Sequence, residues 1–353
     1  MSQFIQLHLL TSYPPANLNR DDLGRPKTAK MGGVDRLRVS SQSLKRTWRM
    51  SDLFQDALSG HIGMRTKRIG EGVHEKLIAG GIAEKKALEW AKEIAGQFGA
   101  LKKDKDNPLN ELEIEQLVHI SPMEQNGVDE LVGKLIAEQR APEAEDLELL
   151  RHEESAADIA LFGRMLASKP AFNTEAACQV AHAISVHPVV IEDDYFTAVD
   201  DLNDHSEDAG AAHIGETGFA AGLFYSYICI NKSLLVDNLN GDEALANRAI
   251  KALTEAATKV APAGKQNSFG SRAYASYVLA EKGEQQPRSL SVAFLKPIDQ
   301  RQSEDFATDA IAALTDQQQK FDQVYGDCAE TRYSLNAVTG DGALAELLDF
   351  VAA

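Results

Sequence analysis

Two basic residues one helical turn apart, Lys45 and Arg49, carry the clearest chemistry in this sequence. In a helix they lie roughly 6 Å apart along the axis, close to the spacing of successive phosphates in a nucleic-acid strand. Ser40 and Gln42, just before them, add hydrogen-bond donors at a helix N-terminus, where the helix dipole favours anions. This combination predicts a surface that holds a phosphate backbone without reading its bases.

The charge of the chain is distributed unevenly. The protein has 353 residues and a formal net charge of −17, which repels phosphate at long range. The stretch RLRVSSQSLKRTWR, residues 36–49, nevertheless holds five basic residues and no acidic one. One interpretation of this uneven distribution is a local anion-binding surface on a protein whose remaining surface repels unrelated nucleic acids. The alternative is a basic helix paired with acidic neighbours.

A second kind of chemistry involves the acids of the first loop and the strand after it. Asp21, Asp22 and Asp35 could hold a magnesium ion for phosphodiester cleavage, which makes a metal-dependent ribonuclease the alternative function. Acids beside basic residues in a loop are more often ion-pair partners. The histidines form no HExxH motif, and AGKQNSFG at 263–270 lacks the spacing of a phosphate-binding loop. We therefore expect no cofactor.

The segment FGRMLAS, residues 162–168, is unusual because it places Arg164 and Met165 between small residues. A bulky apolar side chain on a projecting arm could push between two bases. The alternative is that Met165 is an ordinary core residue.

The elements that position these residues follow from hydrophobic periodicity. Residues 4–11 alternate as a strand, residues 14–33 form a long loop, and RLRV is a short strand. Ser40 or Ser41 caps a helix that runs to about residue 58. On this helix Leu44, Thr47 and Trp48 are assigned to the core, and a second side is formed by Gln42, Lys45, Arg46 and Arg49.

The rest of the chain predicts an α+β fold. Residues 61–160 are helical and acidic, and 157–187 suggest two extended arms joined by a turn, although the Ala-rich second arm could be helical. Strands are expected at 195–199, 219–233, 273–279 and 289–294, with an amphipathic helix at 241–262 and two further helices after residue 300. Without the helical insertion, the order of elements is that of the ferredoxin-like or RRM-like split βαβ pattern.

Composition indicates a globular protein of the reducing cytoplasm. Cys178, Cys229 and Cys328 lie far apart in the sequence, so neither a disulfide framework nor a CxxC metal site is expected. No apolar run approaches the length of a membrane span, and the N-terminus has no secretory pattern. We expect no membrane partner.

Several of these motifs occur together in one known family. SSQSLKR at 40–46, NRDD at 19–22, GRM.AS at 163–168, AHAIS.H at 181–187 and FTAVDDL at 196–202 resemble the CasC family. Its members are the crRNA-binding backbone subunits of the type I-E CRISPR Cascade surveillance complex. The motifs are specific as a set, whereas the helical insertion and the C-terminal region diverge from the family.

The resemblance implies a hand-like organisation and a set of RNA-binding residues. Residues 1–60 and 188–300 would form the RRM-like palm, 61–156 the helical fingers, 157–187 a β-hairpin thumb, and 301–353 C-terminal helices on the palm. The implied palm contacts are Arg20, Ser40, Gln42, Lys45 and Arg49. Met165 would be the wedge of the thumb, and Lys265 and Gln266 match a loop of the family. Asp35 departs from the pattern, which has a basic residue there.

The resemblance also implies the partners. The chain is expected to be a non-catalytic subunit that binds crRNA, meets target DNA through the crRNA, and contacts further copies of itself head to tail. Other Cascade subunits are the remaining partners. The thumb would flip out one nucleotide at regular intervals and leave short segments free to pair.

Overall fold

The protein is described here from a computed structural model that covers residues 3–104, 106–151, 155–198, 213–299 and 301–353. It is a mixed α+β protein whose chain divides into two compact units. Unit 1 comprises residues 1–54, 180–229 and 250–353, and unit 2 comprises residues 55–179 and 230–249. Part of the FTAVDDL motif, residues 199–202, lies outside the described residues.

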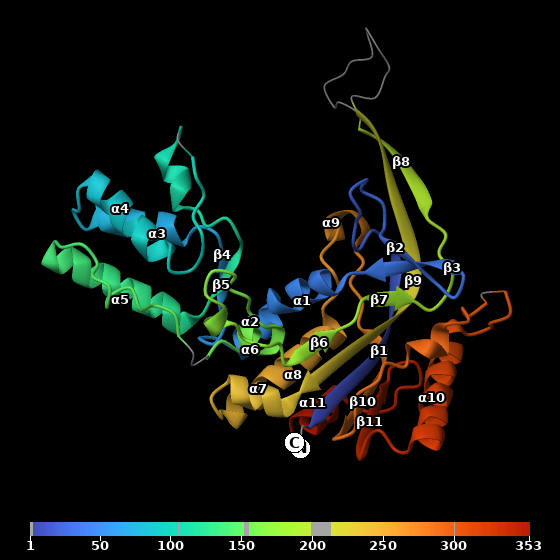
Figure 1. Cartoon of the computed structure of the whole chain (residues 1–353). Coiled ribbons are helices and arrows are strands. Elements are labelled where there is room, and N and C mark those ends of the chain that lie inside the picture. Colours follow the sequence, from blue (N-terminus) through green and yellow to red (C-terminus); the bar gives the residue numbers. More distant parts are fainter. Residues whose placement is uncertain (1–2, 105, 152–154, 199–212, 300) are drawn as a thin grey trace, which may run out of the picture. The chain divides into compact units, whose positions relative to one another are not determined.

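Unit 1 is built on a large sheet whose strands come from both the first and the last part of the chain (Figure 1). Its main path runs in the order β11-β10-β1-β9-β7-β3-β2, with β8 paired to β9. The strands are β1 (Phe4–Ala16), β2 (Thr28–Met31), β3 (Val34–Val39), β7 (Ala183–Ser185), β8 (Glu192–Ala198), β9 (His213–Asn231), β10 (Ala275–Gly283) and β11 (Thr331–Asn336). The first strand therefore lies between two strands that follow much later in the chain, as a split βαβ arrangement requires.

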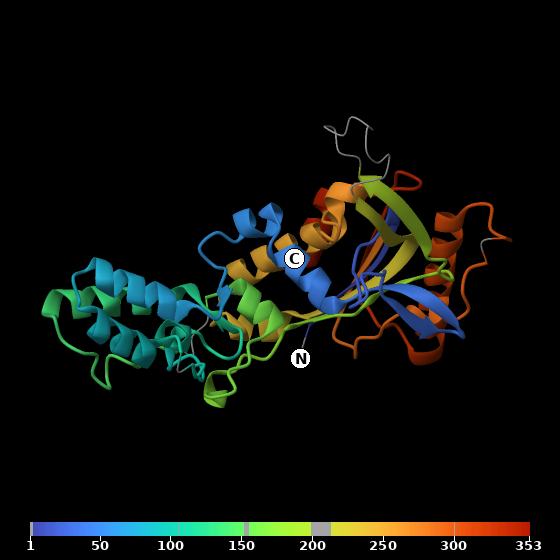
Figure 2. The ribbon, with the colours of Figure 1, turned by 90° about the horizontal axis from the view of Figure 1, so that it is seen from above.

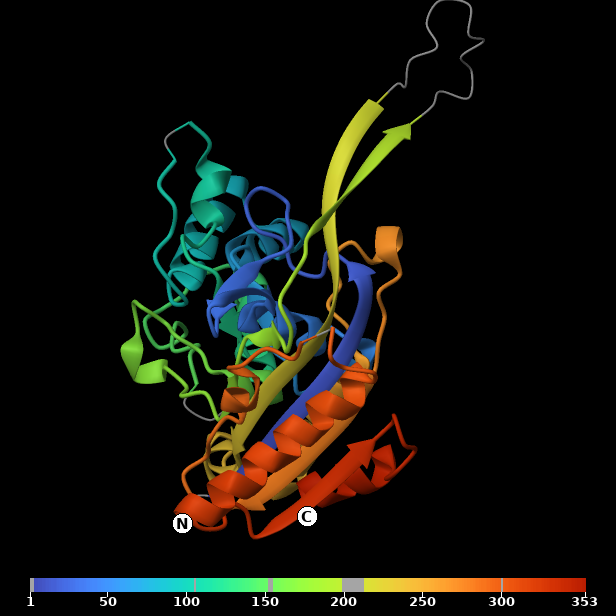
Figure 3. The same cartoon turned by 90° about the vertical axis from the view of Figure 1, so that its right-hand side faces the viewer.

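Helices cover both faces of this sheet. In Figure 2, α10 (Phe306–Tyr325) lies on one side of the strands, and α1 (Ser41–Arg49) with the C-terminal half of α8 (Glu243–Lys259) lies on the other. This explains why β1 is buried along both faces at Leu7 and His8, although its sequence alternates. Figure 3 shows α10 lying across the sheet, where Leu314 joins a core cluster with Tyr225 and Leu279. The last helix, α11 (Leu344–Ala352), packs on β10 and β11.

Unit 2 is mostly helical and has a core of its own. Buried residues such as Leu77, Trp90, Ile94 and Leu135 come from three of its helices. Its elements are α3 (Ile69–Ala79), α4 (Glu84–Ala95), α5 (Pro122–Glu138), α6 (Ala157–Phe162), α7 (Lys232–Asn238), the 3-10 helices η1 (Pro108–Leu112) and η2 (Pro170–Phe172), and the short strands β4 (Met64–Thr66) and β5 (Val118–Ile120). The predicted helical character of residues 61–160 is confirmed in α3, α4 and α5.

The two extended arms predicted for residues 157–187 are not found. Residues 157–162 form α6, because the Ala- and Leu-rich run is buried at almost every position and favours a helix. Gly163, with φ of 79°, ends this helix, and Arg164 and Thr174 form only an isolated bridge. The short strands β6 (Cys178–Val180) and β7 follow. The long hairpin of the described chain is formed instead by β8 and β9.

Three other elements differ from the sequence prediction. The helix expected to reach residue 58 breaks at Met50, and Ser51 starts α2 (Asp52–Ala57) by accepting a hydrogen bond from the backbone N–H of Phe54. The strand expected at 289–294 is the 3-10 helix η3 (Ser291–Phe294). Strand β11 was not expected, because only helices were predicted after residue 300; all of its residues are exposed or half-buried. Within the described residues, no helix is long and apolar enough to cross a membrane.

Candidate nucleic-acid interface

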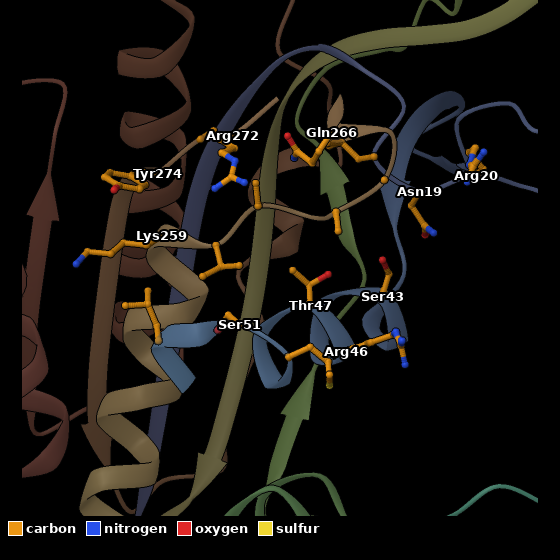
Figure 4. A pocket seen from close by; sticks show the side chains of 18 of the residues that line it. Asn19, Arg20, Ser43, Arg46, Thr47, Ser51, Lys259, Gln266, Arg272 and Tyr274 are labelled. Carbon is orange, nitrogen blue, oxygen red and sulfur yellow. The ribbon is translucent and has the colours of Figure 1, made fainter. Parts of the chain in front are cut away.

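A groove of about 1590 Å³ lies in unit 1, and three segments that are far apart in the sequence line it. They are the loop at residues 18–24, the end of α1 with the start of α2, and the segment 259–274 (Figure 4). The volume exceeds that of a typical small-molecule pocket, which is roughly 300–1,000 Å³. The groove therefore has room for a ligand larger than a typical small molecule.

The first wall is one face of α1. Ser40 caps this helix, since its side chain accepts a hydrogen bond from the backbone N–H of Ser43 at 3.3 Å. Arg46 and Thr47 follow Ser43 at spacings of three and four and line the groove with it. Leu44 is buried on another face of the helix. The amphipathic pattern of the helix thus directs polar side chains into the groove.

The second wall is the loop that carries Arg20. Two sets of hydrogen bonds hold this loop. Asn17 donates through Nδ2 to the carbonyls of Gly24 and Gly218, each at 2.9 Å. Asn19 accepts through Oδ1 from the backbone N–H of Ser40 at 2.9 Å. The loop is therefore fixed both to β9 and to the residue that caps α1.

The third wall is the segment 259–274, which approaches the Arg20 loop very closely. A Cβ added to Gly264 would lie 2.2 Å from the carbonyl oxygen of Leu18, so this position accepts no side chain without a shift of the backbone. Lys265, in the left-handed region with φ of 47°, donates through Nζ to Thr217 Oγ1 at 3.0 Å. This segment and the loop are therefore packed together.

The groove presents cations that no described residue neutralises. Arg20, Arg46 and Arg272 are exposed, and none of the three makes a side-chain hydrogen bond or ion pair with another described residue. Lys259, by contrast, pairs with Glu255 at 2.6 Å. The lining also contains three acids, and Asp21 Oδ1 accepts hydrogen bonds from the backbone of its own loop. Three guanidinium groups without partners among the described residues are suited to binding an anionic ligand.

The structure brings only two of the predicted RNA-binding residues to this groove. Arg20 and Gln266 line it, whereas Gln42, Lys45 and Arg49 do not. Arg49, which was predicted to lie on one side of the helix with Lys45 and to bind RNA, is buried to 7% exposure. It lies next to Trp48 on the part of the helix that packs inward. Ser40 is also buried, at 8%, and acts as the helix cap.

Arg36, at the start of the basic stretch, has a structural role. It is completely buried and donates to the backbone carbonyls of Met31, Ser185 and Phe294. Burial lowers the pKa of its guanidinium from the usual value, but three carbonyl acceptors compensate for the lost water. The prediction that the whole stretch 36–49 contacts phosphates therefore fails at Arg36.

The two residues predicted from the 263–270 loop support that loop. The Nζ of Lys265 is bound to Thr217. Gln266 donates through Nε2 to the carbonyl of Pro262 at 2.8 Å, and its Oε1 is screened from solvent without a hydrogen-bond partner among the described residues. Both side chains hold the shape of the third wall.

Met165 lies in unit 2 and is not a core residue. Its side chain is 80% exposed, next to the buried Leu166, so the alternative of an ordinary core methionine is wrong. Arg164 beside it is buried and pairs with Glu124 at 2.7 Å, and it also donates to the carbonyl of Phe172. These contacts anchor the backbone that carries the exposed methionine.

The acids of the alternative hypothesis do not form a cluster. Asp21 and Asp22 line the groove, but Asp35 does not and sits opposite Lys30 in the β2–β3 hairpin. In the part of the chain that the structure describes, no group of three or more His, Cys, Asp or Glu side chains is placed to hold a metal ion. Cys178, Cys229 and Cys328 are free and buried.

Three groove residues were not assigned a site role from the sequence. Arg46 was predicted to lie on the basic side of its helix but not to bind RNA. The sequence analysis predicted no role for Arg272 or Tyr274. Residues 271–275 alternate between buried and exposed, and this pattern brings Arg272 and Tyr274 to one side of an extended segment. In the sequence the same positions read SRAYA, and this alternation of small residues with Arg272 and Tyr274 is the signal that was available.

The matches to solved structures and to a family model each extend over nearly the whole chain. The solved chain of a "CRISPR RNA-guided surveillance complex, pre-nicking" has a TM-score of 0.83 and 28% sequence identity, with 99% of each chain covered. A second, of a "CRISPR RNA-guided surveillance complex", has a TM-score of 0.74 and 24% identity at the same coverage, which shows the same fold. Comparison with curated proteins finds no match. The family model of the CT1975-like proteins matches residues 5–348, and the chain therefore belongs to the CT1975-like protein family.

Proposed function

We propose that this protein is the crRNA-binding backbone subunit of a type I-E CRISPR Cascade complex, as in the CasC family. The observation that carries the proposal is the full-length likeness, at 28% identity, to a chain of an RNA-guided surveillance complex. The groove of unit 1 supports it, because a large groove whose guanidinium groups have no partner among the described residues suits a single-stranded nucleic acid.

In this proposal the groove binds the RNA by its backbone. Arg20, Arg46 and Arg272 pair with phosphates, and the hydroxyl groups of Ser43 and Thr47 donate further hydrogen bonds. Phosphate contacts fix the position of a strand but carry no sequence information. A subunit that must accept any guide needs this kind of contact.

The proposed assembly is an open array. Copies contact one another head to tail along the crRNA, and a heterologous contact of this type forms an open helix unless its rotation closes a ring. Met165 is proposed to press between bases and flip out a nucleotide, so that the segments between are free to pair with target DNA. The other partners are the remaining Cascade subunits, and the complex acts in the cytoplasm.

The subunit is proposed to be non-catalytic. The test of this point is incubation of the assembled protein with complementary RNA and magnesium, beside the Asp35→Ala variant. Magnesium-dependent cuts that disappear in the variant contradict the proposal and support the ribonuclease.

The experiment that tests the main proposal is purification of the protein together with its co-expressed neighbouring subunits, followed by sequencing of any bound RNA. We expect small RNA molecules to copurify with the protein. A particle that emerges from cells without RNA contradicts the proposal.

A further inference from the structure

Tyr274 is an aromatic residue that the fold leaves largely uncovered at the groove. Its side chain is 70% exposed, although it lies one residue before strand β10 and directly beside the buried Ala275. Figure 4 shows Tyr274 and Arg272 on the same segment that contributes Gln266 to the third wall. An exposed aromatic residue alone needs no explanation, so its surroundings decide whether it has a role.

The surroundings of Tyr274 are those of a binding position. The alternation of buried and exposed residues at 271–275 places Tyr274 and Arg272 on one side of the extended segment. Neither side chain has a hydrogen bond, ion pair or ring contact with another described residue. Other aromatic side chains of unit 1 pack in pairs, such as Tyr13 with Phe224 and Tyr225 with Phe294. In the part of the chain that the structure describes, the Tyr274 ring and the Arg272 guanidinium thus remain available to a ligand in the groove.

We propose that Tyr274 and Arg272 form a stacking site for one unpaired nucleobase of the strand in the groove, with the ring against the base and the guanidinium on the adjacent phosphate. This inference rests on the proposed function and adds a base contact to a groove otherwise described by phosphate contacts. Every nucleobase has a π face, so such a contact accepts any sequence. A guanidinium beside the ring adds a charge-assisted bond to the phosphate.

The ligand class follows from the two groups together. A phosphate-only ligand explains Arg272 but leaves the ring of Tyr274 without a function. An apolar protein segment explains the ring but not three guanidinium groups in one groove without partners among the described residues. A single-stranded nucleic acid supplies a flat base and an anionic backbone at each step of its chain.

The experiment uses the full-length protein and a single-stranded RNA oligonucleotide that carries one 2-aminopurine, placed at successive positions in a series. Fluorescence quenching reports stacking, and titrations at several salt concentrations give the affinity and the salt slope. The variants are Tyr274→Ala, Tyr274→Phe and Arg272→Ala. Tyr325→Ala and Arg301→Ala are matched controls, since both residues are exposed and neither lines the groove. Thermal melting confirms that each variant is folded.

We expect Tyr274→Ala to lose the quenching at one position of the series and to weaken binding by about tenfold, without a change in salt slope. Tyr274→Phe keeps the quenching because it keeps the ring. Arg272→Ala flattens the salt slope by about 0.7. If both Ala variants keep wild-type quenching and affinity while Arg46→Ala weakens binding, the stacking site is wrong and the groove proposal stands. If Arg20→Ala and Arg46→Ala also leave RNA binding unchanged, the proposed function itself is contradicted.

Discussion

The side-chain oxygen of Asn19 accepts a hydrogen bond from the backbone N–H of Ser40 at 2.9 Å, and this bond joins the loop of Arg20 to the cap of α1. Two walls of the groove therefore share one anchor. The position of Arg20 relative to Arg46 depends on it, because the two residues come from the segments that the bond connects.

Asn19→Ala tests this anchor. The substitution leaves the N–H of Ser40, a residue that is 8% exposed, without its acceptor, so we expect a loss of about 1–3 kcal/mol in the free energy of unfolding. RNA affinity should fall as well, since the loop of Arg20 is released. Urea unfolding and RNA titration measure the two effects. Asn267→Ala, at an exposed position outside the lining, should change neither.

Replacing Arg20 and Arg46 together by Ala should weaken RNA binding and flatten its salt dependence. Each lost phosphate contact lowers the slope of log K against log salt by about 0.7, so the double variant should lose roughly 1.4. Arg49→Ala should act differently, by lowering the free energy of unfolding, because Arg49 is buried. If the Arg49 variant has normal stability but a flatter slope of log K against log salt, Arg49 contacts a phosphate instead.

Gly264→Ala should distort the groove. Its Cβ would lie 2.2 Å from the carbonyl oxygen of Leu18, so one of the two segments must move, at a cost of about 1–3 kcal/mol. Gly133→Ala is the matched control. Gly133 lies in helix α5, where an added Cβ would meet no heavy atom within 4 Å beyond its own stretch of helix, and alanine favours helices. We expect the control to be neutral or stabilising in urea unfolding. Equal stability of both variants would contradict the close approach.

The buried pair His8 and Glu281 should make the fold sensitive to acid. Burial lowers the pKa of His8 in the folded protein. Below about pH 6.5 this imidazole is therefore protonated in the unfolded chain but still neutral in the folded one. Burial opposes ionisation of Glu281, but hydrogen bonds from His8 and Arg288 outweigh it and hold its pKa below the usual value. Both groups therefore make the fold less stable as the pH is lowered.

His8→Gln separates the two effects. In the variant, the free energy of unfolding should no longer decrease when the pH is lowered below about 6.5. It should still decrease below about pH 4.3, because Glu281 retains its arginine partners. Urea unfolding at a series of pH values measures both. An unchanged difference in stability between wild type and variant from pH 8 to pH 5 would contradict the role of His8.

Met165→Ala should disturb the regular pattern of flipped nucleotides along the bound RNA. Its exposed side chain is the proposed wedge, and removal should make the nucleotide beside it less reactive to chemical probing in the assembled complex. Met64→Ala, at a second exposed methionine of unit 2, is the control. An unaltered reactivity pattern would remove Met165 from the proposed site.

Local patterns were sufficient to predict the elements that carry the groove. The alternation of Ile5, Leu7 and Leu9 indicated β1, and Ser40 indicated the start of α1. The groove itself was not predicted, because it joins Arg46 to Arg272 and Tyr274 only through tertiary packing. Charge in the sequence also could not distinguish Arg36, which is buried against three carbonyls, from Arg46, which faces solvent.

The hairpin was misplaced for a related reason. Residues 157–162 are apolar enough for a strand, and only their burial on all sides within unit 2 favours the helix. Strands β8 and β9 pair, although residues 199–212 separate them in the sequence. The two strands are therefore not joined by a short turn motif that would have predicted a hairpin. The periodicity of a sequence indicates the secondary structure of one segment, whereas the pairing of a strand depends on a second segment elsewhere in the chain.

The contact between Gly264 and Leu18, with the tie from Lys265 to Thr217, has a thermodynamic consequence. Walls that are already held in place lose little conformational entropy when a strand enters, so the ordering cost of binding falls mainly on the flexible nucleic acid. Calorimetric differences between guides should then follow the stiffness of each free RNA more closely than any property of the protein.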